Sequence, residues 1–145
     1  MYAQVLSKCK AVTRKPLVLT EVETPIATPG DVLIRVHACG ICRTDLHVVE
    51  GELDPARYQL PIIPGHQIVG TLESVPETSS LKPGQRVGVA WLNSTCGDCH
   101  FCRSGRENLC EHPEFTGWTR NGGFAEFVTA PADFVYPLPE QLGDI

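Results

Sequence analysis

Short runs of apolar and β-branched residues, separated by glycine and proline, recur along this chain. Four of them have the length and composition of strands: Val32–Ala38, Gln67–Val75, Arg86–Trp91 and Phe124–Thr129. Pro-Gly turns stand before two of these runs, in Thr28–Asp31 and Lys82–Gln85. The 13 glycines and 12 prolines leave little room for long helices. The pattern predicts a mainly β fold, a partly open barrel with short helical segments.

One segment has helical character, Arg43–Val49, directly after Cys42. There is no Gly-x-Gly-x-x-Gly between a strand and a helix, and strands do not alternate with long amphipathic helices. The sequence therefore predicts that a nucleotide-binding Rossmann domain is absent from this chain. We expect one domain over residues 1–137, and we interpret the polar residues 138–145 as the start of a linker to a missing nucleotide-binding domain.

Length and charge narrow the classes of function. A chain of 145 residues can form one domain with its own core. Its formal net charge of −5 and the lack of a basic run disfavour nucleic acid as a partner. No apolar stretch is long enough for a membrane helix, and Met1–Lys8 lacks the pattern of a signal peptide. We expect a cytoplasmic protein with no membrane partner.

Seven cysteines, an odd number without an export signal, indicate metal ligands rather than disulfides. Cys96, Cys99, Cys102 and Cys110 form a C-x2-C-x2-C-x7-C array. Four thiolates can surround one Zn²⁺ and leave no position open, which is typical of a structural site. The array predicts a zinc-pinned loop over about residues 93–113. Its first residues, Asn93–Thr95, form a glycosylation sequon that we interpret only as part of this loop.

A second group of metal-ligand types surrounds the expected helix. It comprises Cys39, Cys42 and His47, followed at a distance by His66 in Pro-Gly-His. Thiolate and imidazole are both good zinc ligands. Taken alone, each residue also has an ordinary interpretation, because free cysteines are often core residues and a turn histidine can be held by a hydrogen bond.

The order of these motifs resembles the zinc-dependent medium-chain alcohol dehydrogenases. The resemblance is carried by Gly40–His47, Pro64–His66 and the four-cysteine array, with Lys82–Gly88 as the intervening turn and strand. It runs over nearly the whole chain and corresponds only to the N-terminal catalytic domain of those enzymes, which implies a GroES-like β fold. It implies an enzyme that oxidises a small alcohol to an aldehyde or ketone by hydride transfer to NAD(P).

The resemblance also implies roles for individual residues. Cys42 and His66 would be two ligands of a catalytic zinc. Thr44 would hydrogen-bond the substrate hydroxyl, and His47 would relay its proton towards solvent. Arg43 would meet the pyrophosphate of the dinucleotide.

Chemistry supports these roles independently. A metal-bound alcohol becomes more acidic, and a hydroxyl and an imidazole can carry the released proton away. Thr44 and His47 lie one helical turn apart. A helix-start cap is the alternative interpretation of Thr44. Three further residues, Leu53, Trp91 and Leu92, fall where the family lines its alcohol pocket.

Two departures from the family pattern matter. Most members have Glu after the zinc-binding histidine, whereas this chain has Gln67. The third zinc ligand of the family is a cysteine from beyond residue 145; Cys39 and Cys9 are poor replacements by position. We therefore expect one tightly held zinc, a partial catalytic site, and no activity from this fragment alone. The resemblance implies a homo-oligomeric full-length enzyme and allows a monomeric fragment.

Two other functions fit parts of the sequence. A stand-alone zinc-binding β module used for interaction, such as a zinc ribbon contacting nucleic acid, would explain the array. The acidic balance and the mixed charges around the array oppose it. A chaperonin-like barrel would match the fold but leave Cys42, His66 and the array unexplained.

Overall fold

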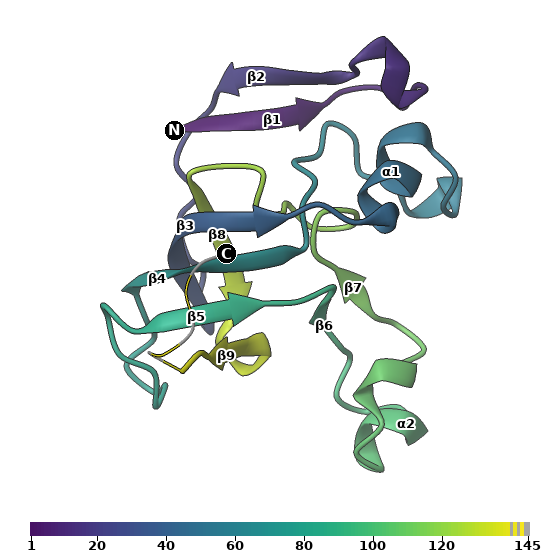
Figure 1. The fold of residues 1–145 in the computed structure, drawn as a ribbon. Helices are drawn as coiled ribbons and strands as arrows, with labels where there is room; N and C mark the ends of the chain where they lie inside the picture. Colours follow the sequence, from purple (N-terminus) through teal and green to yellow (C-terminus); the bar gives the residue numbers. More distant parts are fainter. Residues whose placement is uncertain (140, 142, 144–145) are drawn as a thin grey trace.

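The computed structural model of the chain describes residues 1–139, 141 and 143, and its centre is a five-stranded antiparallel sheet (Figure 1). The strand order is β8-β3-β4-β5-β9. The strands are β3 Asp31–Gly40, β4 Gln67–Ser74, β5 Arg86–Val89, β8 Phe127–Pro131 and β9 Val135–Pro137. Alternate side chains of these strands, such as Val32, Ile34 and Val87, are fully buried in the apolar core of the sheet. The sheet curls into a partly open barrel, which confirms the predicted fold class.

Two strand pairs flank this sheet. Strands β1 (Tyr2–Leu6) and β2 (Leu17–Glu21) pair with each other on one side of it (Figure 1). Single bridges from Ala3 to Ala125 and from Leu6 to Ile62 join β1 to the rest of the domain. Strands β6 (Leu92–Ser94) and β7 (Glu114–Phe115) form the second pair.

The helices are short. Helix α1 (Arg43–Glu50) begins at a capping box and ends at Gly51, whose φ of 79° is left-handed. Its Val48 and Val49 pack with Leu6, Ile62 and Trp118 in a second apolar cluster. The other helical turns are α2 His100–Arg103, η1 Val12–Arg14, η2 Pro55–Arg57, η3 Glu107–Leu109 and η4 Ala132–Phe134.

The four predicted strands and the predicted helix are present, with bounds that differ by one or two residues at β3, β4, β5 and α1 and by more at β8. The expected strand Phe124–Thr129 begins only at Phe127, because the N–H groups of residues 122–124 bond to residues 63–65 instead. Strands β1 and β2 were not predicted. The predicted linker, residues 138–145, lies partly outside the described residues, and its role stays a prediction.

Three observations bear on the other sequence expectations. The named strands of the described residues pair only antiparallel, whereas a Rossmann sheet is parallel. No helix in the part of the chain that the structure describes is long and apolar enough to cross a membrane. Asn93 of the sequon is buried at 4% exposure within β6, where its side-chain amide donates to Thr116 Oγ1. The sequon therefore begins in a strand, whereas the sequence predicted a loop.

Candidate functional site

The cysteine array lies in a lobe that β6 and β7 carry away from the central sheet (Figure 1). We call residues 95–113 the cysteine lobe. Its two helical turns, α2 and η3, contain no buried residue, and Leu109 is 50% exposed. Apolar burial therefore contributes little to holding this lobe in its shape.

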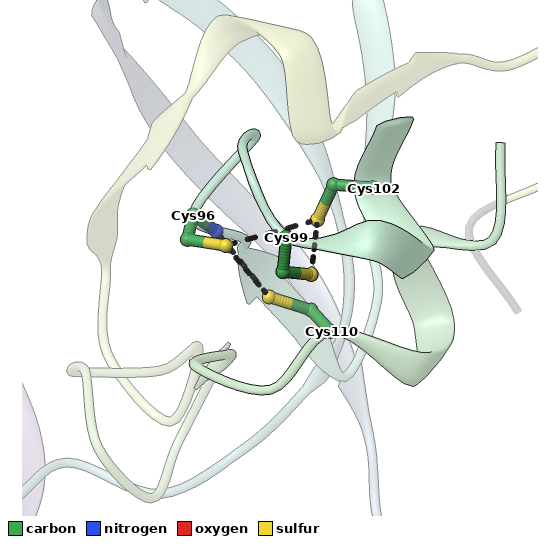
Figure 2. A group of neighbouring side chains, drawn as sticks. All are labelled: Cys96, Cys99, Cys102 and Cys110. Carbon is green, nitrogen blue, oxygen red and sulfur yellow. Dashed lines mark hydrogen bonds between the residues drawn. The ribbon is translucent and has the colours of Figure 1, made fainter. Parts of the chain in front are cut away.

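The four thiols of the lobe converge on one point (Figure 2). The Sγ atoms of Cys99 and Cys102 are 3.5 Å apart, as are those of Cys96 and Cys110, and those of Cys96 and Cys102 are 4.0 Å apart. Zn–S bonds of about 2.3 Å place tetrahedral ligands about 3.8 Å from one another. The thiols thus have the spacing of a Cys₄ zinc site, and no other ligand is required.

Backbone N–H groups stabilise thiolates in this cluster. Cys110 Sγ accepts from the N–H groups of Cys96 (3.4 Å) and His112 (3.3 Å). The N–H of Cys102 lowers the pKa of Cys99 to about 6, whereas the Asp98 side chain raises the pKa of Cys96 to about 12. Zinc binds thiolates, so the donated hydrogen bonds favour the form that the metal needs.

A second group of ligand atoms forms where α1 begins. One ligand atom each of Cys42, Asp45 and His66 lies within 4.8 Å of the others. Cys42 precedes α1 and His66 precedes β4, and their Sγ and Nε2 atoms are 3.3 Å apart. Tetrahedral zinc would separate such a pair by about 3.6 Å. The structure therefore brings together the two residues expected to hold the catalytic zinc, although they are far apart in sequence.

Asp45 was not identified from the sequence, yet it organises this group. Its Oδ1 accepts from His66 Nδ1 at 3.0 Å, and its Oδ2 accepts from the Cys42 N–H at 2.8 Å. The side chain of Asp45 is only 4% exposed and that of His66 only 7%. Hydrogen bonding to Asp45 is the main cause that raises the pKa of His66. Because a carboxylate only accepts, the proton stays on Nδ1 and Nε2 is left to bind a metal.

Thr44 lies beside the thiol rather than at the helix cap. The capping residue of α1 is Cys42, whose Sγ accepts from the Thr44 N–H at 3.3 Å. This excludes the alternative interpretation of Thr44 as the cap. Hydrogen bonding from the Thr44 side chain is the first cause that lowers the pKa of Cys42.

The other two expected α1 residues lie nearer to solvent. His47, one turn after Thr44, is half-buried, and its Nδ1 pairs with the Glu52 carboxylate. Arg43 is exposed at the first position of the helix. Both side chains can therefore be reached from solvent, whereas His66 is buried.

Aromatic rings cover one side of the His66 imidazole. The Trp91 ring meets it edge-on at 5.0 Å and stacks on Trp118 at 5.9 Å and 3°. Leu53 packs against the same cluster. Leu92 instead lines a hollow of about 510 Å³ next to the cysteine lobe. Of the three predicted pocket residues, Trp91 contacts the His66 ring, Leu53 packs in the apolar cluster that Trp91 also joins, and Leu92 lines the separate hollow. Trp118, which sequence reasoning missed, stacks on Trp91.

The remaining thiols have structural surroundings. Cys39 lies against Gly65 and Gly123, and burial raises its pKa to about 11. Cys9 donates to the Val48 carbonyl at 3.6 Å. Neither belongs to a metal-ligand group among the described residues.

Sequence comparison relates the chain to alcohol dehydrogenases. Residues 28–140 match the family model of the alcohol dehydrogenase GroES-like domain. An alcohol dehydrogenase of Geobacillus stearothermophilus is 48% identical over 130 residues, covering 89% of this chain and 38% of the relative. One of Rhizobium meliloti is 46% identical over 129 residues, covering 88% and 38%. The chain thus spans about 38% of the length of these curated relatives.

Solved structures show the same likeness. A cobalt- and zinc-bound thermostable alcohol dehydrogenase from Pyrobaculum aerophilum is 31% identical with a TM-score of 0.86, over 98% of this chain and 42% of that one. An NAD-dependent alcohol dehydrogenase is 27% identical with a TM-score of 0.89, over 99% and 41%.

Proposed function

Because the chain belongs to the alcohol dehydrogenase GroES-like domain family, we propose that it is the metal-binding catalytic region of a zinc-dependent alcohol dehydrogenase. That enzyme oxidises a small alcohol to an aldehyde or ketone with NAD(P). The observation that carries the proposal is the approach of Cys42 Sγ to His66 Nε2, at 3.3 Å, next to Thr44. An interaction module alone would need only the cysteine lobe and would leave this pair without a purpose.

The two groups of ligands have different tasks. The four cysteines of the lobe would hold a structural zinc, and Cys42 and His66 would hold part of a catalytic site. A zinc ion there supplies Lewis acidity, which lowers the pKa of an alcohol hydroxyl. Asp45 contributes by fixing the proton on His66 Nδ1.

Residues of α1 provide a path for the alcohol proton. The Thr44 hydroxyl can accept that proton while it donates its own, because a hydroxyl does both. His47 lies one turn further along the same helix and contacts solvent, held by Glu52. An imidazole ring can take up a proton and release it again, so His47 can pass the proton to water. Exposed Arg43 is placed to meet an anionic group such as the dinucleotide pyrophosphate.

Zinc stoichiometry tests the proposal. We expect the 145-residue chain to retain one Zn²⁺ through gel filtration and to take up a second only at higher zinc concentration. The reason is that Cys42 and His66 give two strong ligands, whereas both oxygens of Asp45 are already engaged. His66→Ala should abolish the weak site and leave the tight one. Two tightly held ions, or a weak site that survives His66→Ala, would overturn the assignment.

Gln67 sets a second expected result. It is exposed at the start of β4 directly after His66, and the oxygen of its side-chain amide, Oε1, lies against Gly40. A carboxylate here would add negative charge beside the metal pair and assist ligand exchange. Gln67→Glu should therefore change the zinc dissociation rate of the weak site by about 10–100-fold, towards faster exchange.

Chelator-competition kinetics would measure that rate. Gln59→Glu is the matched control, since it adds the same charge at an exposed position in another part of the chain. Equal dissociation rates for the unsubstituted chain and the Gln67 variant would contradict the expectation.

A further inference from the structure

A glycine-rich loop packs directly on the segment that carries His66. We define residues 116–124 as the glycine loop. The N–H groups of residues 122–124 donate to the carbonyl oxygens of residues 63–65 at 2.6–3.0 Å. The side-chain oxygen of Asn121 accepts a further N–H from the same segment, at 3.0 Å. These four bonds fix the backbone immediately before His66.

Glycine makes this approach possible. A Cβ added at Gly122 would lie 2.0 Å from Gly65 O and 2.8 Å from Pro64 O, and one at Gly117 would lie 2.7 Å from Gly65 N. Real Cβ atoms do not come that close to backbone, so a side chain at Gly122 must displace the Pro64–Gly65 peptides. Gly122 has no left-handed φ, unlike Gly117 at +78°. Position 122 therefore requires glycine because there is no space for a side chain, not because of its backbone conformation.

The glycine loop also fixes the ring that covers His66. Its first residue, Thr116, is fully buried and bonds Trp91 O through its N–H (2.9 Å) and Ala90 O through its hydroxyl (2.8 Å). Trp91 in turn contacts the imidazole at 5.0 Å. The glycine loop thus holds both the backbone that precedes His66 and the backbone of Trp91, the aromatic neighbour of the imidazole.

We propose that the glycine loop positions the His66 imidazole for metal binding and that Gly122 is its main positioning residue, an inference that rests on the proposed role of His66 as a zinc ligand. Gly122 touches neither metal nor substrate; it acts through the Pro64–Gly65 backbone. The imidazole must satisfy Asp45 on Nδ1 and approach Cys42 through Nε2 at once. A shift of the backbone before it breaks one of these two relations.

Cobalt binding tests the inference in the 145-residue chain, with the cysteine lobe first loaded with one equivalent of zinc. Titrated Co²⁺ then gives a thiolate charge-transfer band when it binds Cys42 and His66. Gly122→Ala should weaken Co²⁺ binding by about 10–100-fold and shift the band. Asn121→Ala, which removes one hydrogen bond without adding atoms, should cause a smaller change in the same direction.

Two glycine variants separate positioning from loss of stability. A Cβ at Gly70 would lie 2.2 Å from Arg35 O within the central sheet, so Gly70→Ala should lower the melting temperature but leave Co²⁺ affinity unchanged. At Gly88 the nearest atom is 3.4 Å away, so Gly88→Ala should change neither. If Gly122→Ala or Asn121→Ala alters only the melting temperature, the positioning role is wrong.

The proposed function can fail separately. Absence of the band in the unsubstituted chain would overturn the assignment of Cys42 and His66 as ligands. NMR signals of the His66 ring would still report its position in the metal-free site. They should shift in Gly122→Ala and not in Gly70→Ala, and unshifted signals in both variants would overturn the positioning role.

Discussion

Substitution of Cys110 by serine is expected to unfold the cysteine lobe and to remove the tightly held zinc. Cys110 is the buried member of the array, 8% exposed, and its sulfur accepts two backbone N–H groups. Structural zinc contributes about 10–16 kcal/mol in small zinc-binding peptides. The helical turns of this lobe bury no side chain that could replace that contribution. We therefore expect residues 95–113 to lose amide protection, measured by hydrogen exchange.

Cys9→Ser is the matched control for this experiment. Cys9 has a half-buried thiol that lies outside both ligand groups, and a serine hydroxyl at this position can still donate to the Val48 carbonyl. The control should keep its zinc and the protection of the lobe. A Cys110 variant with lobe amides as protected as in the unsubstituted chain would show that packing, not metal, holds the lobe.

The central strands were predictable because burial on the sheet follows their sequence alternation. In β3, Val32 and Ile34 face the core while their neighbours do not. Strand β2 offers no such signal, since Val18 and Leu19 are adjacent and both more than half exposed. The shift of β8 has a tertiary cause: residues 122–124 pair with residues 63–65, a contact that local propensity does not contain.

The same distinction holds for the site. The spacing of the array is local, so it predicted a ligand cluster that the structure assembles. The pairing of Cys42 with His66 was expected only from the family resemblance, because nothing local links positions 24 residues apart. Asp45 had a weak local signal, a carboxylate three residues after the helix-capping position. Its bond to His66, and the stacking of Trp118 on Trp91, depend on tertiary packing.

Asp45→Asn should cost the weak metal site most of its affinity while leaving the fold nearly intact. An amide oxygen can still accept the Cys42 N–H and so keep the capping box of α1. Towards His66, however, its NH₂ group can donate to Nδ1, which would move the ring proton to Nε2 and block the metal-binding nitrogen. We expect metal affinity at Cys42 and His66 to fall by about 10–100-fold. Competition titration measures the affinity, and ¹⁵N NMR reports the tautomer.

Asp45→Ala separates the two roles of the carboxylate. It removes the Asp45 half of the capping box and leaves a buried His66 N–H without a partner, so stability should fall by about 2–4 kcal/mol in addition to the loss of metal affinity. Asp54→Asn is the control, because Asp54 caps a helical turn through the Ala56 N–H but does not touch the metal pair. If Asp45→Asn binds metal like the unsubstituted chain, the carboxylate serves only the helix. If it loses as much stability as Asp45→Ala, its effect on metal binding reflects unfolding rather than the tautomer of His66.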